Sequence, residues 1–209
     1  MTFQPDLFES FPVVGILRGF SDDLIEPLTE ASAEAGLTNL EITMNTKNAA
    51  QQIKAAVQAS DGKMNIGAGT VTSTEILDYA LDAGASYIIT PDVNLEVMEL
   101  CLEREVPVFP GAFTPTEIHQ AWQMGATMVK IFPANILGPE FIKSFRGPFE
   151  DISLMPTGGV SLDNIQDYIK AGADAFGVGS PLFRKDKIEA KNWEWMKSQI
   201  MSFKKHFKI

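Results

Sequence analysis

The chain has 209 residues, of which 45% are hydrophobic and 21% charged, and this length and composition suit one sizeable hydrophobic core. The formal net charge of -10 argues against nucleic acid or an anionic membrane as a partner, so an anionic ligand would need a locally positive site. The sequence has no apolar run of about 18 residues and no basic leader before an apolar segment. We therefore expect a single domain over residues 1–209, in the cytoplasm.

Short β-rich runs alternate along the chain with amphipathic helical stretches. The predicted strands lie at 13–17, 38–42, 64–68, 87–90, 106–109, 127–131, 152–155 and 173–178. The predicted helices lie at 22–35, 47–59, 73–83, 94–104, 114–124, 139–145, 161–170 and about 191–206. Four of these helices are expected to end in a glycine that caps the helix just before a strand, namely Gly36, Gly84, Gly125 and Gly172.

The spacing of the strands predicts the fold. Successive strands begin about 20 to 26 residues apart, which is the size of a compact βα unit. Eight such units predict an α/β fold of the (β/α)8 or TIM-barrel type rather than an open doubly wound sheet. Residues 1–12 are expected to form a cap over the N-terminal mouth, and residues 191–209 the last helix and a basic tail. Unusual residues should gather at the carboxyl ends of the strands, where this fold places its active sites.

One lysine, Lys130, interrupts the sixth predicted strand and shares a face with Met128 and Phe132. Desolvation of an ammonium lowers its pKa and leaves a neutral amine that can form a Schiff base with a carbonyl. In a second interpretation, Lys130 ends an edge strand and its ammonium reaches water. Arg18 and Glu41 end the first two strands and could converge with Lys130 at one mouth, or could form a plain ion pair across the two strands.

Glycines follow the last two predicted strands. Gly158 and Gly159 come after the seventh, and Gly177 and Gly179 accompany the eighth. Each pair precedes a predicted helix start, where free backbone N–H groups favour an anion, and these two loops are the usual phosphate site of this fold. The glycines could instead serve only to permit tight turns. Neither histidine has partners at metal-ligand spacing, so no metal is expected.

Seven motifs at the predicted strand ends resemble, in order, those of the 2-keto-3-deoxy-6-phosphogluconate (KDPG) and 2-keto-4-hydroxyglutarate (KHG) aldolase family. They are Ile16-Leu-Arg18-Gly19, Glu41-Ile-Thr43, Gly67-Ala-Gly69-Thr70-Val71, Thr90-Pro91-Asp92, Pro110-Gly111-Ala-Phe-Thr114-Pro115-Thr116-Glu117, Val129-Lys130-Ile-Phe132-Pro133-Ala134 and Pro156-Thr157-Gly158-Gly159-Val160. The resemblance spans about residues 12–184. It implies a class I lyase on a (β/α)8 barrel, commonly a homotrimer, that needs no metal or other cofactor because it binds its substrate as a covalent Schiff base.

The resemblance also implies roles for single residues. Lys130 would form the Schiff base and Glu41 would act as general acid and base. The other implied binding residues are Thr70, Pro91 and Phe132 around the pyruvyl group and Gly158, Gly159, Gly179 and Ser180 in the phosphate loops. The implied substrate is a phosphorylated 2-keto-3-deoxy sugar acid: KDPG would give pyruvate and glyceraldehyde 3-phosphate, and 4-hydroxy-2-oxoglutarate would give pyruvate and glyoxylate.

One position departs from the family pattern. The phosphogluconate branch has an arginine for the substrate carboxylate where this chain has Asn45, whereas the related 2-keto-3-deoxy-6-phosphogalactonate aldolases have asparagine there. The phosphogalactonate is therefore an alternative substrate. We expect Arg18 to hold the carboxylate instead, and Asn45 to contact a hydroxyl near C4. Two other hypotheses stay open: a barrel that binds a phosphosugar without turning it over, and a phosphosugar isomerase or epimerase, which would not require an interior lysine.

Overall fold

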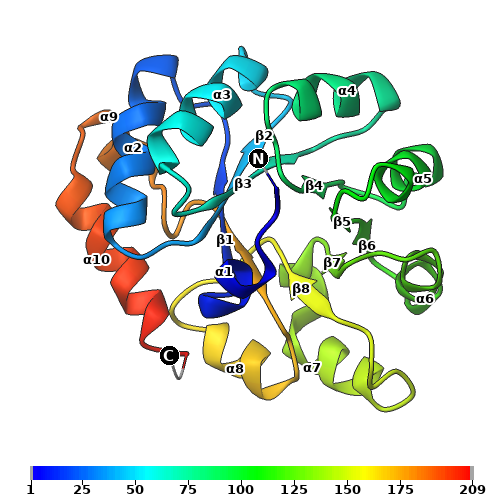
Figure 1. Cartoon of the computed structure of the whole chain (residues 1–209). Helices are drawn as coiled ribbons and strands as arrows, with labels where there is room; N and C mark the ends of the chain where they lie inside the picture. Colours follow the sequence, from blue (N-terminus) through cyan, green and yellow to red (C-terminus); the bar gives the residue numbers. More distant parts are fainter. Residues whose placement is uncertain (1, 208–209) are drawn as a thin grey trace.

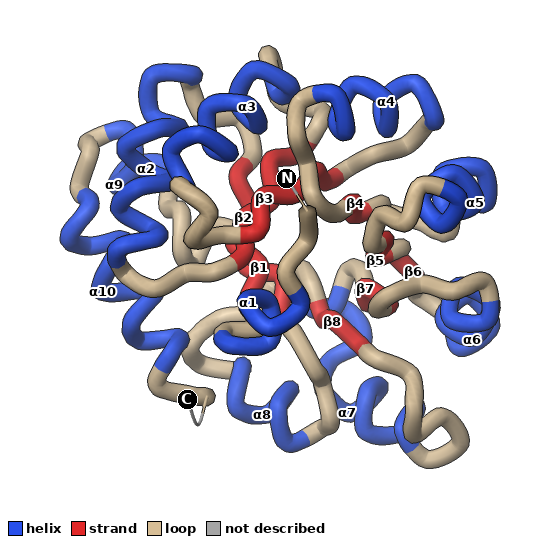
Figure 2. The backbone as a smooth tube through the Cα atoms, in the orientation of Figure 1, coloured by secondary structure: helices blue, strands red, loops and turns tan. Residues whose placement is uncertain are grey.

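A computed structural model describes residues 2–207 and shows helices arranged around a curled set of parallel strands (Figures 1 and 2). The strands are β1 (Val13–Leu17), β2 (Asn39–Thr43), β3 (Asn65–Gly69), β4 (Ile88–Ile89), β5 (Val108–Phe109), β6 (Gly111–Ala112), β7 (Val129–Ile131), β8 (Leu154–Pro156) and β9 (Phe176–Val178). The helices are α1 (Pro5–Ser10), α2 (Asp22–Glu34), α3 (Ala49–Ser60), α4 (Thr74–Asp82), α5 (Leu95–Glu103), α6 (Pro115–Gln123), α7 (Ala134–Arg146), α8 (Ile165–Lys170), α9 (Lys185–Glu189) and α10 (Trp193–Lys204).

The strands form two sheets in which every pairing is parallel. The first sheet has the order β5-β4-β3-β2-β1-β9 and the second the order β6-β7-β8. An isolated bridge between Thr157 and Gly177 joins the end of β8 to β9, and only Pro110 separates β5 from β6 along the chain. The strands of both sheets therefore present their carboxyl ends on the same side.

Each predicted strand overlaps a strand of the structure, but several are shorter than the apolar runs that predicted them. The run at 173–178 gives only β9, because Asp174 and Ala175 approach β8 through backbone bonds to Leu154 outside the regular ladder. Helix α7 begins before the predicted position 139, because its first N–H groups bond to carbonyls of the loop after β8. It breaks at Gly138, with φ of 70° and ψ of 173°. The sequence analysis predicted neither β6 nor α9.

Helix boundaries follow local side-chain chemistry. Thr114 and Glu117 form a reciprocal capping box at the start of α6, and the Asn94 side chain accepts a hydrogen bond from the backbone at the start of α5. The four predicted capping glycines all have positive φ, with values of 84° at Gly36, 97° at Gly84, 98° at Gly125 and 94° at Gly172. These glycines let each helix end and turn into the next strand.

The N-terminal segment lies across the amino ends of β2 and β3. Asn65 exchanges two hydrogen bonds with the backbone of Gln4, at 2.8 and 3.0 Å, and also donates to the Asn39 side chain at 3.0 Å. Asn39 in turn donates to the Phe11 carbonyl at 3.0 Å. These amides tie α1 to the strands. Figure 1 shows α1 near the centre of the view, in front of the strands. The last two residues of the expected basic tail, 208 and 209, lie outside the described part of the chain.

Two groups of apolar side chains fill the molecule. The larger group lies mainly between the strands and the surrounding helices. The smaller group, called the inner cluster below, is enclosed by the strands and α1; it consists of Phe8, Val14, Tyr87, Ile89, Phe109, Met128, Met155 and Ala175. The inner cluster fills the space beneath the side chains that point toward the carboxyl ends of the strands.

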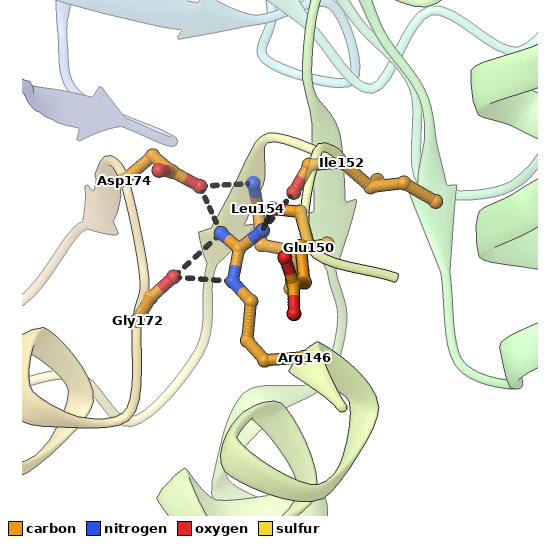
Figure 3. Close-up of polar contacts among 6 residues, drawn as sticks. All are labelled: Arg146, Glu150, Ile152, Leu154, Gly172 and Asp174. Atoms are coloured by element: carbon orange, nitrogen blue, oxygen red, sulfur yellow. Dashed lines mark hydrogen bonds and ion pairs between the residues drawn. The ribbon is translucent and has the colours of Figure 1, made fainter. Parts of the chain in front are cut away.

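A polar contact network built on Arg146 joins α7, β8 and the segment before β9 (Figure 3). The Arg146 guanidinium donates to the carbonyls of Gly172, Glu150 and Ile152, and forms an ion pair with Asp174. Asp174 also accepts a hydrogen bond from the Leu154 N–H at 2.7 Å. One side chain thus fixes the amino end of β8 relative to the chain that leads into β9.

Candidate active site

A cavity of about 560 Å³ opens at the carboxyl ends of the strands. Its walls come from β1, β2, β7 and β9 and from the loops that follow β1, β7, β8 and β9. The predicted site residues that line it are Arg18, Glu41, Lys130, Phe132, Gly158, Gly159, Gly179 and Ser180. Residues far apart in the sequence therefore meet at one site because parallel strands bring their carboxyl ends together.

Three predicted site residues are not among those that line this cavity. Thr70 follows β3 with a positive φ of 58° and is half-buried. Pro91 follows β4 so closely beside β6 that a Cβ at Gly111 would lie 2.3 Å from the Pro91 carbonyl oxygen. Asn45 lies exposed on the turn after β2. Thr70 and Pro91 thus end strands β3 and β4 beside the cavity, whereas Asn45 lies on the surface.

Lys130 lies inside the molecule. It belongs to β7, the middle strand of its sheet, and pairs with Gly111 on one side and Met155 on the other. The residue is 5% exposed, and its Nζ lies 4.7 Å from the centroid of the Phe132 ring. The interpretation that Lys130 ends an edge strand and reaches water is therefore wrong.

Glu41 reaches the cavity from β2 and is 2% exposed. Its neighbour strand β3 carries glycines on the facing side: Gly67 pairs with Glu41, and a Cβ at Gly69 would lie 1.5 Å from Glu41 Oε1. No residue with a side chain fits at Gly69 while the carboxyl keeps this position. The Gly67-Ala-Gly69 motif therefore makes the space that the Glu41 side chain occupies.

Burial shifts the titration of both groups toward the neutral form. The pKa of Lys130 is lowered, chiefly by desolvation; the Glu41 charge opposes this shift and Arg18 adds to it. The pKa of Glu41 is raised, again chiefly by desolvation, and the positive charges of Lys130 and Arg18 oppose the rise. A neutral amine and a carboxyl that can exchange a proton are the groups that Schiff-base chemistry requires.

Arg18 approaches the cavity on the loop after β1 and its side chain is exposed. Within residues 2–207 it forms no ion pair with Glu41, so the plain pair considered from the sequence is not formed. The following residue, Gly19, donates its N–H to the buried Thr46 hydroxyl at 3.0 Å, and Thr46 contacts the Thr43 hydroxyl at 3.2 Å. Thr46 was not singled out from the sequence, and it anchors the loop that carries Arg18.

The glycine loops form the other end of the cavity. Gly158 and Gly159 have φ values of 90° and 81°, and the Gly158 carbonyl accepts the N–H of Asn135. Among residues 2–207, the N–H groups of Gly158, Gly159, Val160, Gly179 and Ser180 bond to no protein acceptor. The expected helix starts are wrong in detail, because α8 begins only at Ile165 and α9 at Lys185. The donors available to an anion are therefore loop N–H groups rather than helix N-termini.

Two of the lining residues that were not assigned a role from the sequence carry polar side chains, Thr157 and Lys185. The Thr157 hydroxyl donates to the Met155 carbonyl at 3.3 Å and occupies space left by Gly177, where a Cβ would lie 2.3 Å away. Lys185, at the start of α9, adds an exposed ammonium beside the glycine loops. In the sequence, Lys185 lies in a basic run shortly after Gly179-Ser180, and this run is the signal from which its place at the cavity could have been predicted.

Between residues 2 and 207, no group of three or more His, Cys, Asp and Glu side chains is arranged to hold a metal ion. None of the helices in this range combines the length and the apolar character that a membrane span needs. Cys101 is buried on α5, and desolvation raises the pKa of its thiol to about 12.

Comparison with known proteins places this site in a family. Residues 6–199 match the family model described as KDPG and KHG aldolase. A 2-dehydro-3-deoxy-phosphogluconate aldolase of Pseudomonas aeruginosa is 37% identical over 183 residues, which cover 87% of this chain and 81% of that protein. A probable 2-dehydro-3-deoxy-6-phosphogalactonate aldolase of Rhizobium meliloti is 36% identical over 174 residues, covering 83% and 82%.

A solved structure agrees with these relatives. The KDPG aldolase of Legionella pneumophila, with pyruvate captured as a covalent carbinolamine intermediate, superposes with a TM-score of 0.89 at 27% identity, covering 96% of this chain and 98% of that one. The family match over nearly the whole chain accompanies a cavity that contains a buried lysine and a buried glutamate. The chain therefore belongs to the KDPG and KHG aldolase family.

Proposed function

We propose that this protein is a class I aldolase that cleaves KDPG to pyruvate and glyceraldehyde 3-phosphate. The observation that carries the proposal is that Lys130 and Glu41, both almost fully buried, line one cavity whose far end is formed by unpaired loop N–H groups. A buried amine forms the covalent bond, the carboxyl moves protons, and the loop donors suit a phosphate. The names of the relatives from Pseudomonas and Rhizobium support the same reaction class.

The first half of the reaction forms the covalent intermediate. The neutral amine of Lys130 attacks the C2 ketone of the substrate and gives a carbinolamine, the kind of species captured in the Legionella enzyme. Glu41 protonates the departing hydroxyl, so that water leaves and an iminium forms. Because burial lowers the pKa of Lys130, a larger fraction of its amine is neutral than for an ordinary surface lysine.

The second half breaks the carbon–carbon bond. Glu41, as a carboxylate, removes the proton of the C4 hydroxyl, and the electrons of the C3–C4 bond move into the iminium to give an enamine. The aldehyde departs as glyceraldehyde 3-phosphate. Protonation of the enamine at C3 and hydrolysis of the resulting iminium release pyruvate and restore Lys130. No step of this sequence needs a metal ion or another cofactor.

The carboxylate and the phosphate of the substrate would bind on opposite sides of Lys130 and Glu41. We assign the carboxylate to Arg18, whose planar guanidinium can form two parallel hydrogen bonds. We assign the phosphate to the loop N–H groups of Gly158, Gly159, Gly179 and Ser180, with Phe132 lying against the reacting carbons. Thr70 and Pro91 would complete the pyruvyl side, since they follow β3 and β4, the two strands next in order after β2, which carries Glu41.

The alternative substrate is the phosphogalactonate, which differs from KDPG at C4. The Rhizobium relative carries that name at nearly the same identity as the Pseudomonas relative, and this chain has Asn45 where the phosphogluconate branch has arginine. KHG, as 4-hydroxy-2-oxoglutarate, is a further candidate because its cleavage uses the same steps and yields glyoxylate. The values of kcat/KM for the three compounds, measured side by side, rank them; we expect KDPG to be highest.

We also propose the complete architecture. The sheets would close as a (β/α)8 barrel if β5 and β6 count as one strand broken at Pro110, and the bridge between Thr157 and Gly177 supports closure at β8 and β9. The whole chain would then be one domain with the N-terminal segment as a cap. We propose that it works in the cytoplasm as a homotrimer, with no nucleic-acid or membrane partner.

The test of the function is chemical trapping. Incubation with pyruvate and sodium borohydride should reduce the Schiff base to a stable secondary amine, and mass analysis should find the added mass on the peptide that contains Lys130. Lys130→Ala should abolish both the trapping and the release of pyruvate from KDPG, while circular dichroism shows an unchanged fold. Lys170→Ala, which removes an exposed lysine on α8, is the matched control and should behave like wild type.

The same experiment separates the remaining hypotheses. A phosphosugar isomerase or epimerase would not form the borohydride-stable adduct, and a binding protein would release no pyruvate from any of the three compounds. A folded Lys130→Ala variant with near-normal turnover would exclude the aldolase mechanism. Loss of wild-type activity on treatment with EDTA would point to a metal-dependent reaction instead.

A further inference from the structure

Tyr87, directly before β4, is the polar member of the inner cluster, and its side chain is fully buried. Its ring packs against the rings of Phe3 and Phe109, with centroids 5.8 and 5.5 Å away. Within the described residues, the buried hydroxyl has no hydrogen-bond partner. Because buried polar groups in proteins are almost always paired, an unpaired hydroxyl in an otherwise apolar cluster requires an explanation.

The strand register directs this ring toward Glu41. Glu41 on β2 pairs with Gly67 on β3, and the pair formed by Ala68 and Ile88 places Tyr87 beside Gly67 on the other side. A Cβ at Gly67 would lie 2.3 Å from Cζ and from Cε2 of Tyr87. The Cζ end of the Tyr87 phenol therefore lies over the backbone of Gly67, which pairs with Glu41.

The Tyr87 phenol and the Glu41 carboxyl lie beside two glycines on the same face of β3. Gly67 and Gly69 are two residues apart and so point to the same side of β3. The Tyr87 ring fills the space at Gly67, and the Glu41 carboxyl fills the space at Gly69. Desolvation raises the pKa of Tyr87 well above its ordinary value, and the Glu41 charge adds to the rise. The phenol consequently remains protonated, as a hydrogen-bond donor, while Glu41 is charged.

We propose that Tyr87 is a positioning residue for Glu41: from the side of the inner cluster, its hydroxyl donates a hydrogen bond to one water molecule, which in turn donates to the carboxylate. This bond orients the carboxylate toward the substrate and favours its charged form, which removes the C4 hydroxyl proton. The proposal rests on the acid and base role proposed for Glu41.

The other groups that act on Glu41 limit what the hydroxyl can do. Lys130 faces it from β7 and Arg18 from the loop after β1, while β3 offers only glycines on this side. Lys185 lies on the same cavity from α9. Lys130 and Arg18 favour the charged carboxylate, and both remain in a Tyr87 variant. Removal of the hydroxyl should therefore change the Glu41 pKa by the contribution of a single hydrogen bond.

The test is the pH dependence of Tyr87→Phe with KDPG as substrate. The acidic limb of kcat/KM reports the essential base of the free enzyme. Loss of a hydrogen bond to the charged form raises the pKa of Glu41, so this limb should move to higher pH by roughly 0.5 to 1 unit. The value of kcat at the pH optimum should fall roughly tenfold, with KM near the wild-type value, because the substrate contacts are unchanged.

Matched variants separate positioning from packing. Phe109→Leu disturbs the inner cluster without touching a hydroxyl and should lower the melting temperature while leaving the acidic limb in place. Tyr79→Phe removes an exposed hydroxyl on α4 and should change nothing. Tyr87→Met, a second variant without the hydroxyl, should reproduce the shift of the limb.

Two results would overturn the assignment. The first is a Tyr87→Phe enzyme with the wild-type kcat and pH profile. The second is a Phe109→Leu enzyme whose acidic limb moves as far as that of Tyr87→Phe. A wild-type enzyme that releases no pyruvate from KDPG, the phosphogalactonate or KHG would instead overturn the proposed function, and the role of Tyr87 together with it.

Discussion

Arg18 is the arginine that lines the cavity, and we propose that it binds the substrate carboxylate. A planar guanidinium matches a carboxylate with two parallel hydrogen bonds, which neither an ammonium nor an amide can do. Asn45, which stands where the phosphogluconate branch has arginine, lies exposed on the turn after β2 and does not line the cavity. The Thr46 hydroxyl that holds Gly19 in place gives Arg18 a fixed starting point.

We expect Arg18→Ala to raise the KM for KDPG roughly 30-fold, because the substrate carboxylate would lose its charged partner. This change corresponds to about 2 kcal/mol of binding free energy. Arg18→Lys should have a smaller effect of the same sign, and Asn45→Arg should partly rescue Arg18→Ala. Steady-state kinetics with Arg104→Ala as control, a surface arginine paired with Asp78, measures the effect. An Arg18→Ala enzyme that binds pyruvate as tightly as wild type would contradict this assignment.

Lys185 adds positive charge to the cavity of a protein whose net charge is negative. A protein with a net charge of -10 repels a phosphorylated acid. The cavity differs from the rest of the molecule, because it is lined by three basic residues, Arg18, Lys130 and Lys185, and by one acidic residue, Glu41. The ammonium of Lys185 is exposed and pairs only at 3.7 Å with Glu189, so it can turn toward a phosphate on the glycine loops. Its contribution should be modest because solvent screens it.

Lys185→Gln should therefore raise the KM for phosphorylated KDPG about fivefold, or roughly 1 kcal/mol, and leave the KM of the unphosphorylated analogue unchanged. The effect should shrink as salt is added. Lys187→Gln, on the same helix but outside the cavity lining, is the control. An equal change for both substrates would show that Lys185 does not act on the phosphate.

At the scale of elements, the polar network of Arg146 joins three parts of the chain: α7, the residues around the start of β8 and the segment before β9. Its guanidinium satisfies carbonyls of the loop before β8 and of the turn after α8, and it pairs with Asp174 (Figure 3). The side chain is 19% exposed, so these bonds are partly shielded from water. The network lies at the amino ends of β8 and β9, away from the cavity.

Arg146→Ala should lower the free energy of unfolding by about 2 to 3 kcal/mol, because several carbonyls and a carboxylate lose their donor together. For a chain of this size the melting temperature should fall by roughly 5 to 10 °C. At low temperature kcat should stay near wild type. Lys143→Ala on the exposed face of α7 should change stability by less than about 0.5 kcal/mol; calorimetry compares the two. A melting temperature of Arg146→Ala equal to that of Lys143→Ala would refute the role of the network.

At the scale of the whole molecule, the surface suggests assembly. Several large apolar side chains are exposed, namely Tyr79, Leu95, Leu102, Phe113, Ile136 and Met201. Association would remove some of this surface from water. The family resemblance implies a homotrimer, so light scattering at micromolar concentration should give about three times the mass of one chain. A clean monomer with full activity would exclude the trimer without affecting the mechanism.

The sequence by itself determined the order of strands and helices, the capping glycines and the motifs at the strand ends. Each of these is decided by residues that are close in the chain: a period of two or of about 3.6, a capping residue, or a positive φ at glycine. The period of two also places Lys130 on one face with Met128 and Phe132, but this pattern left open whether the ammonium reaches water, and the tertiary structure decided that the residue is buried.

Tertiary structure alone decided what lies opposite each of these residues. The register of β2, β3 and β4 places Glu41 and Tyr87 on either side of Gly67, and the folding of the last loop brings Lys185 to the glycine turns. The relation between Glu41 and Tyr87 has no local signal, since strand pairing depends on packing between segments far apart in the chain. The same reason explains why Asn45, one residue from a buried threonine, faces water instead of the cavity.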